Sequence, residues 1–169
     1  MQIKHHKTPD CTSQATYSEC THYRYSLTRR WSLGATLNFV MLNPSTADET
    51  QNDPTVERCE RRARMLGFGA FCVTNIFAWR DTDPHAMRRV DHPVGPENNV
   101  ALLSAARVAD QVIAAWGTHG AHLERGAEVA AMLRAQGINL YHLGLSKHGH
   151  PRHPLYVPYA QQAVIWQNA

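Results

Sequence analysis

The chain has 169 residues, 43% of them hydrophobic, and a formal charge of +3 with histidine neutral. This length suits one domain with a sizeable core and is too short for two. No stretch approaches the roughly 18 apolar residues of a membrane span, and the first seven residues contain no apolar signal-peptide core. We therefore expect a cytoplasmic protein with no membrane partner.

The cysteines and the charge distribution narrow the expected cofactors and ligands. No two of the four cysteines form a Cys-x-x-Cys pair, which disfavours a zinc or iron–sulfur site. Cys59 and Cys72 fall at apolar positions and are predicted to be reduced core residues. No Asp or Glu follows Glu128, so the last 41 residues (169 − 128) carry only basic and histidine charges. One end of the fold should therefore attract anions.

The first part of the chain predicts an arm followed by a hairpin. Residues 1–22 are expected to form a polar, weakly ordered arm, and residues 23–169 a single α/β domain. Residues 23–31 and 36–42 alternate in polarity enough to be strands. The short segment between them has turn-forming residues, which predicts an antiparallel hairpin.

Helices and strands are expected to alternate in the rest of the chain. Asp53 is suited to cap a helix that begins at Pro54 and ends before Gly67. The further elements expected are a strand over 70–76, a helix over 96–109, a strand over 111–116, a helix over 121–136 and a strand over 138–143. Right-handed crossovers turn this order into a three-layer α/β/α fold with a central, mostly parallel sheet of about four strands.

Four polar loops follow the four expected parallel strands. In open α/β sheets, ligands bind beyond the carboxyl ends of such strands. The first loop places Asn43, Ser45 and Asp48 directly after a strand, which is a higher density of polar groups than a connector requires. The same residue types also make turns and caps, and capping is the favoured interpretation for Asp53 alone. Taken together, the four loops predict a binding site at this edge.

The last of these loops, GLSKHGHPRHP over 144–154, is strongly basic. It is stiffened by prolines and should bind phosphate or carboxylate. A zinc site is less favoured because carboxylate ligands are missing locally, and a solvated basic segment is the remaining alternative. The chain contains no G-x-S-x-G, H-E-x-x-H or Walker A motif, so we expect neither a metal nor another cofactor.

The same loops resemble a known family over nearly the whole chain. Tyr23-Arg24-Tyr25, MLNPSTAD, VTNIFAWR, AAWG and GHPRHPLY are similar to domain-of-unknown-function family 1643, which is mainly bacterial and uncharacterised. This resemblance implies family membership and says nothing of activity.

A looser resemblance is to the uracil-DNA glycosylase-like superfamily, and it implies that superfamily's fold. Leu42-Asn43-Pro44-Ser45 is similar to its first motif, G-x-N-P-G, whose Asn positions the attacking water. Thr74-Asn75 resembles its second-strand motif, whose Asn reads the amide edge of a flipped base. His150-Pro151-Arg152 is similar to its final motif, H-P-S. The resemblance therefore implies roles for Asn43, Asn75 and His150.

This resemblance implies that the chain is a nucleic-acid base N-glycosylase, or a protein that binds a flipped base or a nucleotide. The residues expected to be catalytic are Asn43, Asp48 and His150. Those expected to bind the base or ligand are Ser45, Asn75, Phe77, Trp79 and Arg80. Those expected to bind phosphates of DNA, RNA or a nucleotide are Lys147, Arg152 and His153.

Simpler explanations and other function classes stay open. Core packing explains Phe77 and Trp79 as well as stacking on a base does, and Asn75 has the alternative role of capping a turn at the end of its strand. An enzyme acting on free nucleosides or nucleotides is the second function class, and a non-catalytic nucleic-acid-binding module is the third.

Overall fold

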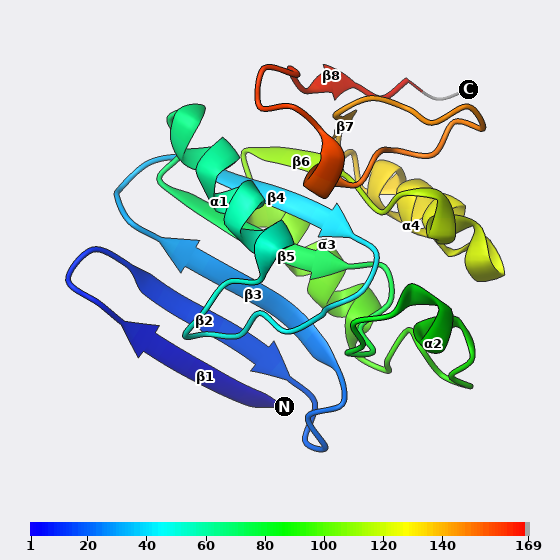
Figure 1. Cartoon of the computed structure of the whole chain (residues 1–169), viewed down its shortest axis with the longest axis horizontal. Helices are drawn as coiled ribbons and strands as arrows, with labels where there is room; N and C mark the ends of the chain where they lie inside the picture. Colours follow the sequence, from blue (N-terminus) through cyan, green and yellow to red (C-terminus); the bar gives the residue numbers. More distant parts are fainter. Residues whose placement is uncertain (168–169) are drawn as a thin grey trace.

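The computed structural model describes residues 1–167 and contains one sheet of eight strands. Their order across the sheet is β1-β2-β3-β5-β4-β6-β7-β8 (Figure 1). The strands are β1 (Gln2–Lys7), β2 (Thr12–Tyr17), β3 (Arg24–Arg30), β4 (Thr36–Met41), β5 (Ala70–Asn75), β6 (Gln111–Ala114), β7 (Leu140–His142) and β8 (Val164–Ile165).

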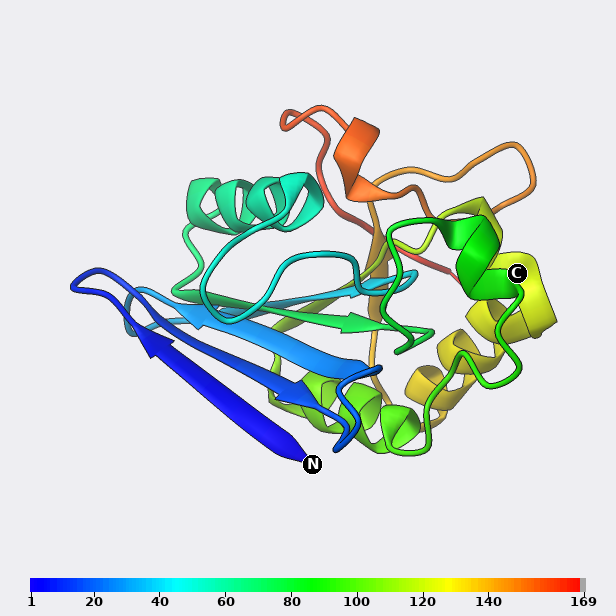
Figure 2. The same cartoon turned by 60° about the horizontal axis from the view of Figure 1, so that its bottom comes forward.

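Helices lie on both faces of this sheet. They are α1 (Pro54–Met65), α2 (Pro84–Arg88), α3 (Asn98–Val108) and α4 (Arg125–Ala135), with 3-10 segments η1 (Thr118–Glu124) and η2 (Pro154–Tyr156). Figure 2 shows α1 and η2 on one side of the sheet, and α3 and α4 on the other. As predicted, α1 begins at Pro54, because the Asp53 side chain accepts the Val56 N–H at 2.8 Å.

The predicted fold class was wrong, because the sheet is larger and mixed. Strand β4 pairs in parallel with β5 and β6, and β6 with β7. The other four pairs, β1 with β2, β2 with β3, β3 with β5, and β7 with β8, are antiparallel. An eight-stranded, mostly antiparallel mixed sheet thus replaces the expected mostly parallel sheet of about four strands. The uracil-DNA glycosylase-like fold is not supported.

The expected hairpin of β3 and β4 is also absent, because β5 lies between these strands. Strand β3 pairs with β5 in the register Leu27 to Val73. The connection from β3 to β4 is held by the residue just before β5, since the N–H groups of Trp31 and Ser32 both donate to the Gly69 carbonyl. Strand β4 is buried, so its backbone N–H and C=O groups need hydrogen-bond partners along both of its edges. Strands β5 and β6 supply these partners.

Residues 1–22, expected to be a weakly ordered arm, instead contribute β1 and β2 to the sheet. In β2, Ser13, Ala15 and Tyr17 are buried while the residues between them are more exposed. This alternation is typical of a strand with one face on the core. It was missed in the sequence because serine and alanine are small and carry little apolar signal.

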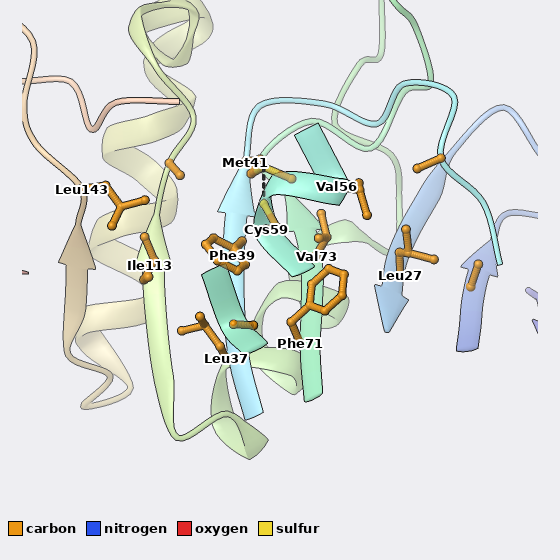
Figure 3. Close-up of a cluster of buried hydrophobic side chains, with 14 of the residues drawn as sticks. Leu27, Leu37, Phe39, Met41, Val56, Cys59, Phe71, Val73, Ile113 and Leu143 are labelled. Carbon is orange, nitrogen blue, oxygen red and sulfur yellow. Dashed lines mark hydrogen bonds between the residues drawn. The ribbon is translucent and has the colours of Figure 1, made fainter. Parts of the chain in front are cut away.

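The core consists of two clusters, one on each face of the sheet. On the α1 face, Phe39, Phe71 and Ile113 pack beneath Val56 and Cys59 (Figure 3). On the opposite face, residues of β4 and β6 pack against α3 and α4. The predicted burial of Cys59 and Cys72 is confirmed. No helix within residues 1–167 is both long enough and apolar enough to cross a membrane.

Candidate ligand-binding cleft

A cleft of about 610 Å³ lies at the edge of the sheet where β4 and β5 end. Six segments form its walls: the start of β3, the loop after β4, the start of α1, the end of β5 with the loop before α2, the loop after β6, and η2. The arrowheads of β4 and β5 reach this edge together in Figure 1, and β3 starts there. These segments come together because the parallel strands β4 and β5 end on the same side of the sheet, where the antiparallel strand β3 begins.

Asn43 lies on the cleft wall immediately after β4, with its amide held in one orientation. Its Nδ2 donates to the carbonyl of Asp81 at 2.9 Å and to that of Pro44 at 3.3 Å. Both donors are thus directed at the backbone. The Oδ1 atom is the side-chain group left to meet a ligand or a water molecule.

Asn75, the last residue of β5, also lines the cleft and is only 1% exposed. Neither its Nδ2 nor its Oδ1 has a hydrogen-bond partner within residues 1–167. Its backbone carbonyl, by contrast, accepts a hydrogen bond from Asn98 Nδ2 at 2.8 Å. A buried amide without partners costs roughly 1–3 kcal/mol of stability. The side chain therefore suits a ligand that offers one donor and one acceptor.

Arg24, the first residue of β3, brings a buried positive charge to the same cleft. It is 1% exposed, and burial lowers the pKa of its guanidinium to about 10. Its Nη1 donates to the Ala47 carbonyl, but its Nε has no partner within residues 1–167. The guanidinium remains protonated at neutral pH, so the cleft contains a cation with unused hydrogen-bonding capacity.

Asp53 and His153 both line the wall formed by α1 and η2, close enough for their charges to interact. The Asp53 carboxylate accepts N–H groups from Val56 and Ala47, at 2.8 Å and 3.3 Å. Burial lowers the pKa of His153, while the charge of Asp53 acts in the opposite direction. Because His153 Nδ1 accepts the Leu155 N–H at 3.4 Å, the proton of the neutral ring belongs on Nε2.

Several residues expected in the site lie elsewhere. Asp48 is outside the cleft, where its Oδ1 accepts the Thr50 N–H and hydroxyl and the Gln51 N–H. Phe77 is fully buried beside His122, at 5.6 Å between ring centroids. Trp79 packs edge-on against Tyr23, and Arg80 donates to the Thr21 carbonyl. None of these four residues lines the cleft.

The basic loop contributes one of its predicted residues to the cleft. His153 lines the wall, whereas Lys147 and Arg152 are exposed outside it. His150 is also outside, in a turn where its N–H donates to Ser146 Oγ at 3.1 Å. Of the three residues implied by the glycosylase resemblance, Asn43 and Asn75 come together in one cleft and His150 does not. Ser45, also expected to bind the ligand, lines the cleft.

Sequence reasoning missed other groups that line the cleft, namely Arg24, Thr55, His119 and Tyr156. Arg24 carried a signal, because an arginine at a buried position of a strand requires a partner or a ligand. Tyr156 is 85% exposed at the rim. His119 lies 5.0 Å from His85 between ring centroids, and burial and nearby positive groups lower its pKa. Neither Tyr156 nor His119 stands out in the sequence without the fold.

Partly buried histidines make stability depend on pH. Burial lowers the pKa values of His119, His122, His142 and His153 below the ordinary 6.5. Below pH 6.5 the unfolded chain therefore binds more protons than the folded one, so the free energy of unfolding falls as the pH drops. Urea unfolding at pH 7.5 and pH 5.5 measures this, and His153→Gln is expected to lessen the difference. Stability that is constant or rises on acidification would contradict this expectation.

Comparison with known proteins places the chain in a family. Residues 24–155 match the family model described as "Protein of unknown function (DUF1643)". The chain belongs to this family. Neither the curated proteins nor the solved structures searched contain a match. The match includes the cleft segments from Arg24 to Leu155, so the cleft lies almost wholly within the family's shared region.

Proposed function

We propose that the cleft binds a nucleoside or nucleotide and reads its base through Asn75. The observation that carries this proposal is the buried Asn75 amide, whose donor and acceptor both lack partners in the described chain. A side-chain amide pairs with a ring N–H beside a carbonyl, as in uracil, thymine, guanine or hypoxanthine. Satisfying both atoms at once supplies affinity and specificity together.

A comparison within the molecule separates Asn75 from the structural asparagines. Three asparagines are buried in the described part of the chain, and the two besides Asn75 use their Nδ2 atoms to hold backbone. Asn38 Nδ2 donates to the Cys72 carbonyl at 3.2 Å, and Asn98 Nδ2 donates to the carbonyls of Asn75 and Ile76. Within residues 1–167 only Asn75 has both side-chain atoms buried and unpartnered. A purely structural role for Asn75 does not explain why its side-chain amide, unlike the other two, makes no hydrogen bond to any described residue.

The size and rim of the cleft support a flat small molecule. A volume of about 610 Å³ falls within the roughly 300–1,000 Å³ of small-molecule sites. Tyr156, 85% exposed at the rim, offers an aromatic face on which a base can stack. The exposed basic residues Lys147 and Arg152 lie outside the cleft, which favours a free nucleoside or nucleotide over a nucleic-acid strand.

Calorimetric titration with a ligand panel tests this function. We expect at least one of uridine, thymidine, guanosine and inosine, or its 5′-monophosphate, to bind. The analogue methylated at the ring N–H is expected to bind far more weakly, because it lacks the donor. Affinity for a free nucleoside should change little between low and moderate salt, whereas a short DNA or RNA strand would respond steeply. Failure of the whole panel to bind, or equal binding of the methylated analogue, would refute the proposal.

Hydrolysis of an N-glycosidic bond is a second candidate, favoured by the fixed Asn43 amide. Its Oδ1 is suited to orient a water whose oxygen bonds to the sugar C1′, while the electron pair of the broken bond leaves with the base. The water proton passes to a carboxylate of the cleft, Asp53 or Asp81, because Asp48 lies outside. Because Nδ1 of His153 accepts a hydrogen bond, its Nε2 carries the proton and can donate it to the departing base.

Asn43→Ala is expected to lower kcat for nucleoside hydrolysis about 100- to 1,000-fold. Its KM should change little, because the base contacts of Asn75 remain. Base release followed by chromatography measures turnover, and Thr46→Ala in the same loop, exposed and outside the lining residues, is the matched control. Undiminished turnover in Asn43→Ala would eliminate Asn43 as the group that positions water.

A further inference from the structure

Four arginines are buried within residues 1–167, and one of them differs from the rest. Arg29, Arg62 and Arg125 each use their guanidinium groups in at least three hydrogen bonds or ion pairs. They tie loops and strand ends together. Arg24 makes one hydrogen bond, from Nη1 to the Ala47 carbonyl. Within residues 1–167 it forms no ion pair with a carboxylate, and its Nε is buried without a partner.

A buried cation without a counter-ion is unfavourable unless something else neutralises it. Removing a charge from water costs several kcal/mol, and a fold normally offsets this with a paired carboxylate or with several acceptors. Arg24 has one acceptor in the described chain, and the Asp53 carboxylate attracts it only from beyond ion-pair distance. Arg29 on the same strand, by contrast, donates to four acceptors in the loop between β4 and α1. Since Arg24 lines the cleft, the missing partner is best supplied by a ligand that binds there.

The start of α1 adds a second positive feature beside Arg24. Thr55 and Val56, in the first turn of this 12-residue helix, line the same cleft. Pro54 has no N–H, and the Val56 N–H is used by Asp53, so Thr55 presents the remaining N–H of the first turn. A helix N-terminus favours an anion because its unpaired N–H groups carry partial positive charge.

The carboxylates of the cleft are already engaged. Asp53 accepts N–H groups from Val56 and Ala47, and Asp81 Oδ1 accepts the Asp83 N–H at 3.0 Å. His153, His119 and Tyr156 complete the titratable lining, and the two histidines gain positive charge on acidification. The guanidinium and the helix terminus are therefore the groups with free capacity for a doubly charged oxyanion.

We propose that Arg24 and the N-terminus of α1 form a phosphate subsite, so that the ligand of this cleft is a nucleoside monophosphate rather than a nucleoside. This proposal rests on the proposed function for the identity of the base, but the anion site itself does not. Asn75 then reads the base, and Arg24 holds the phosphate by charge-assisted hydrogen bonds from its fork of N–H donors.

The affinity ratio between a 5′-monophosphate and its nucleoside tests the subsite. Wild-type protein is expected to bind the monophosphate about 10- to 100-fold more tightly in calorimetry. In Arg24→Met this ratio should fall to near 1, while the affinity for the nucleoside stays within about threefold. Methionine fills a similar space without charge, so we expect the variant to fold. A wild-type ratio near 1 overturns the subsite whether or not the variant folds.

Arg80→Met is the matched control for a general charge effect. Arg80 is an arginine close enough to influence the Arg24 guanidinium electrostatically, yet it lies outside the cleft and donates to the Thr21 carbonyl. Its replacement removes the same charge from the same region. We expect the affinity ratio to remain within about threefold of wild type. A ratio that collapses equally in Arg80→Met would overturn the specific role of Arg24.

Inorganic phosphate separates failure of the subsite from failure of the proposed function. Phosphate should raise the melting temperature of wild-type protein and leave that of Arg24→Met unchanged. If it does so while no nucleoside or nucleotide binds, the subsite stands and the base-reading function falls. If nucleosides bind but phosphate neither stabilises the protein nor competes with the monophosphate, the function stands and the subsite is refuted.

Discussion

Replacing Asn75 by leucine is expected to abolish ligand binding and, at the same time, to stabilise the unliganded protein. Leucine has nearly the shape of asparagine but no polar atoms, so it removes a donor and an acceptor that are buried without partners. The free energy of unfolding should rise by about 1–2 kcal/mol. Affinity for the nucleoside or nucleotide should fall about 100-fold or more, because the base edge loses both contacts.

Asn98→Leu is the matched control for this pair of effects. Its Nδ2 donates to the carbonyls of Asn75 and Ile76, at 2.8 Å and 3.1 Å. Removing it leaves two buried carbonyls without that donor, and we expect the protein to lose about 2 kcal/mol or more. Urea unfolding and calorimetry measure both variants. A loss of stability in Asn75→Leu comparable to that in Asn98→Leu would show that Asn75 is structural.

Arg29→Met is expected to destabilise the protein by about 3–5 kcal/mol, the largest effect among the variants considered. The Arg29 guanidinium holds the loop between β4 and α1 from inside. Its Nη2 donates to the carbonyls of Asp48 and Gln51, at 2.7 Å and 3.0 Å, and its Nε donates to Asn52 Oδ1 at 2.8 Å. Methionine replaces none of these donors, so the loop that carries Asn43 and Asp53 loses its anchor.

Denaturant unfolding and ligand titration together measure this anchoring role. Affinity should also fall in Arg29→Met, because Asn43, Ser45 and Asp53 are positioned by the same loop. Arg61→Met on α1 is the control, since Arg61 forms an exposed ion pair with Glu57 that contributes little. A change of less than about 1 kcal/mol in Arg29→Met would contradict the anchoring role.

Local sequence signals were enough to place α1 and the two cleft asparagines. Asp53 followed by Pro54 fixes the start of α1, because the cap and the first turn depend only on neighbouring residues. Asn43 follows a strongly apolar strand, and Asn75 is the last residue of another. Their meeting at one edge follows from parallel pairing of those strands, which the alternation of helices and strands indicates.

Motif resemblance was less reliable for the residues farther along the chain. His150 and Arg152 match a motif by residue type, but the turn closed by the Ser146 N–H and the His150 carbonyl directs the chain so that His153 reaches the cleft instead. Phe77 and Trp79 follow Asn75 closely in sequence, yet they enter the core and the β3 side of the fold. Proximity along the chain does not determine which side chain faces the ligand.

The sequence by itself indicated α1, α3, α4 and the strands β4, β5, β6 and β7, but not α2, and it indicated two of the amides that line the cleft. These features depend on periodicity and on short-range caps. Only the tertiary structure decided that β3 lies antiparallel beside β5, which brings Arg24 to the edge where β4 and β5 end. Pairing between strands 40 to 46 residues apart, from Arg30 with Ala70 to Leu27 with Val73, is selected by burial of whole faces and by backbone hydrogen bonds. No local pattern encodes it.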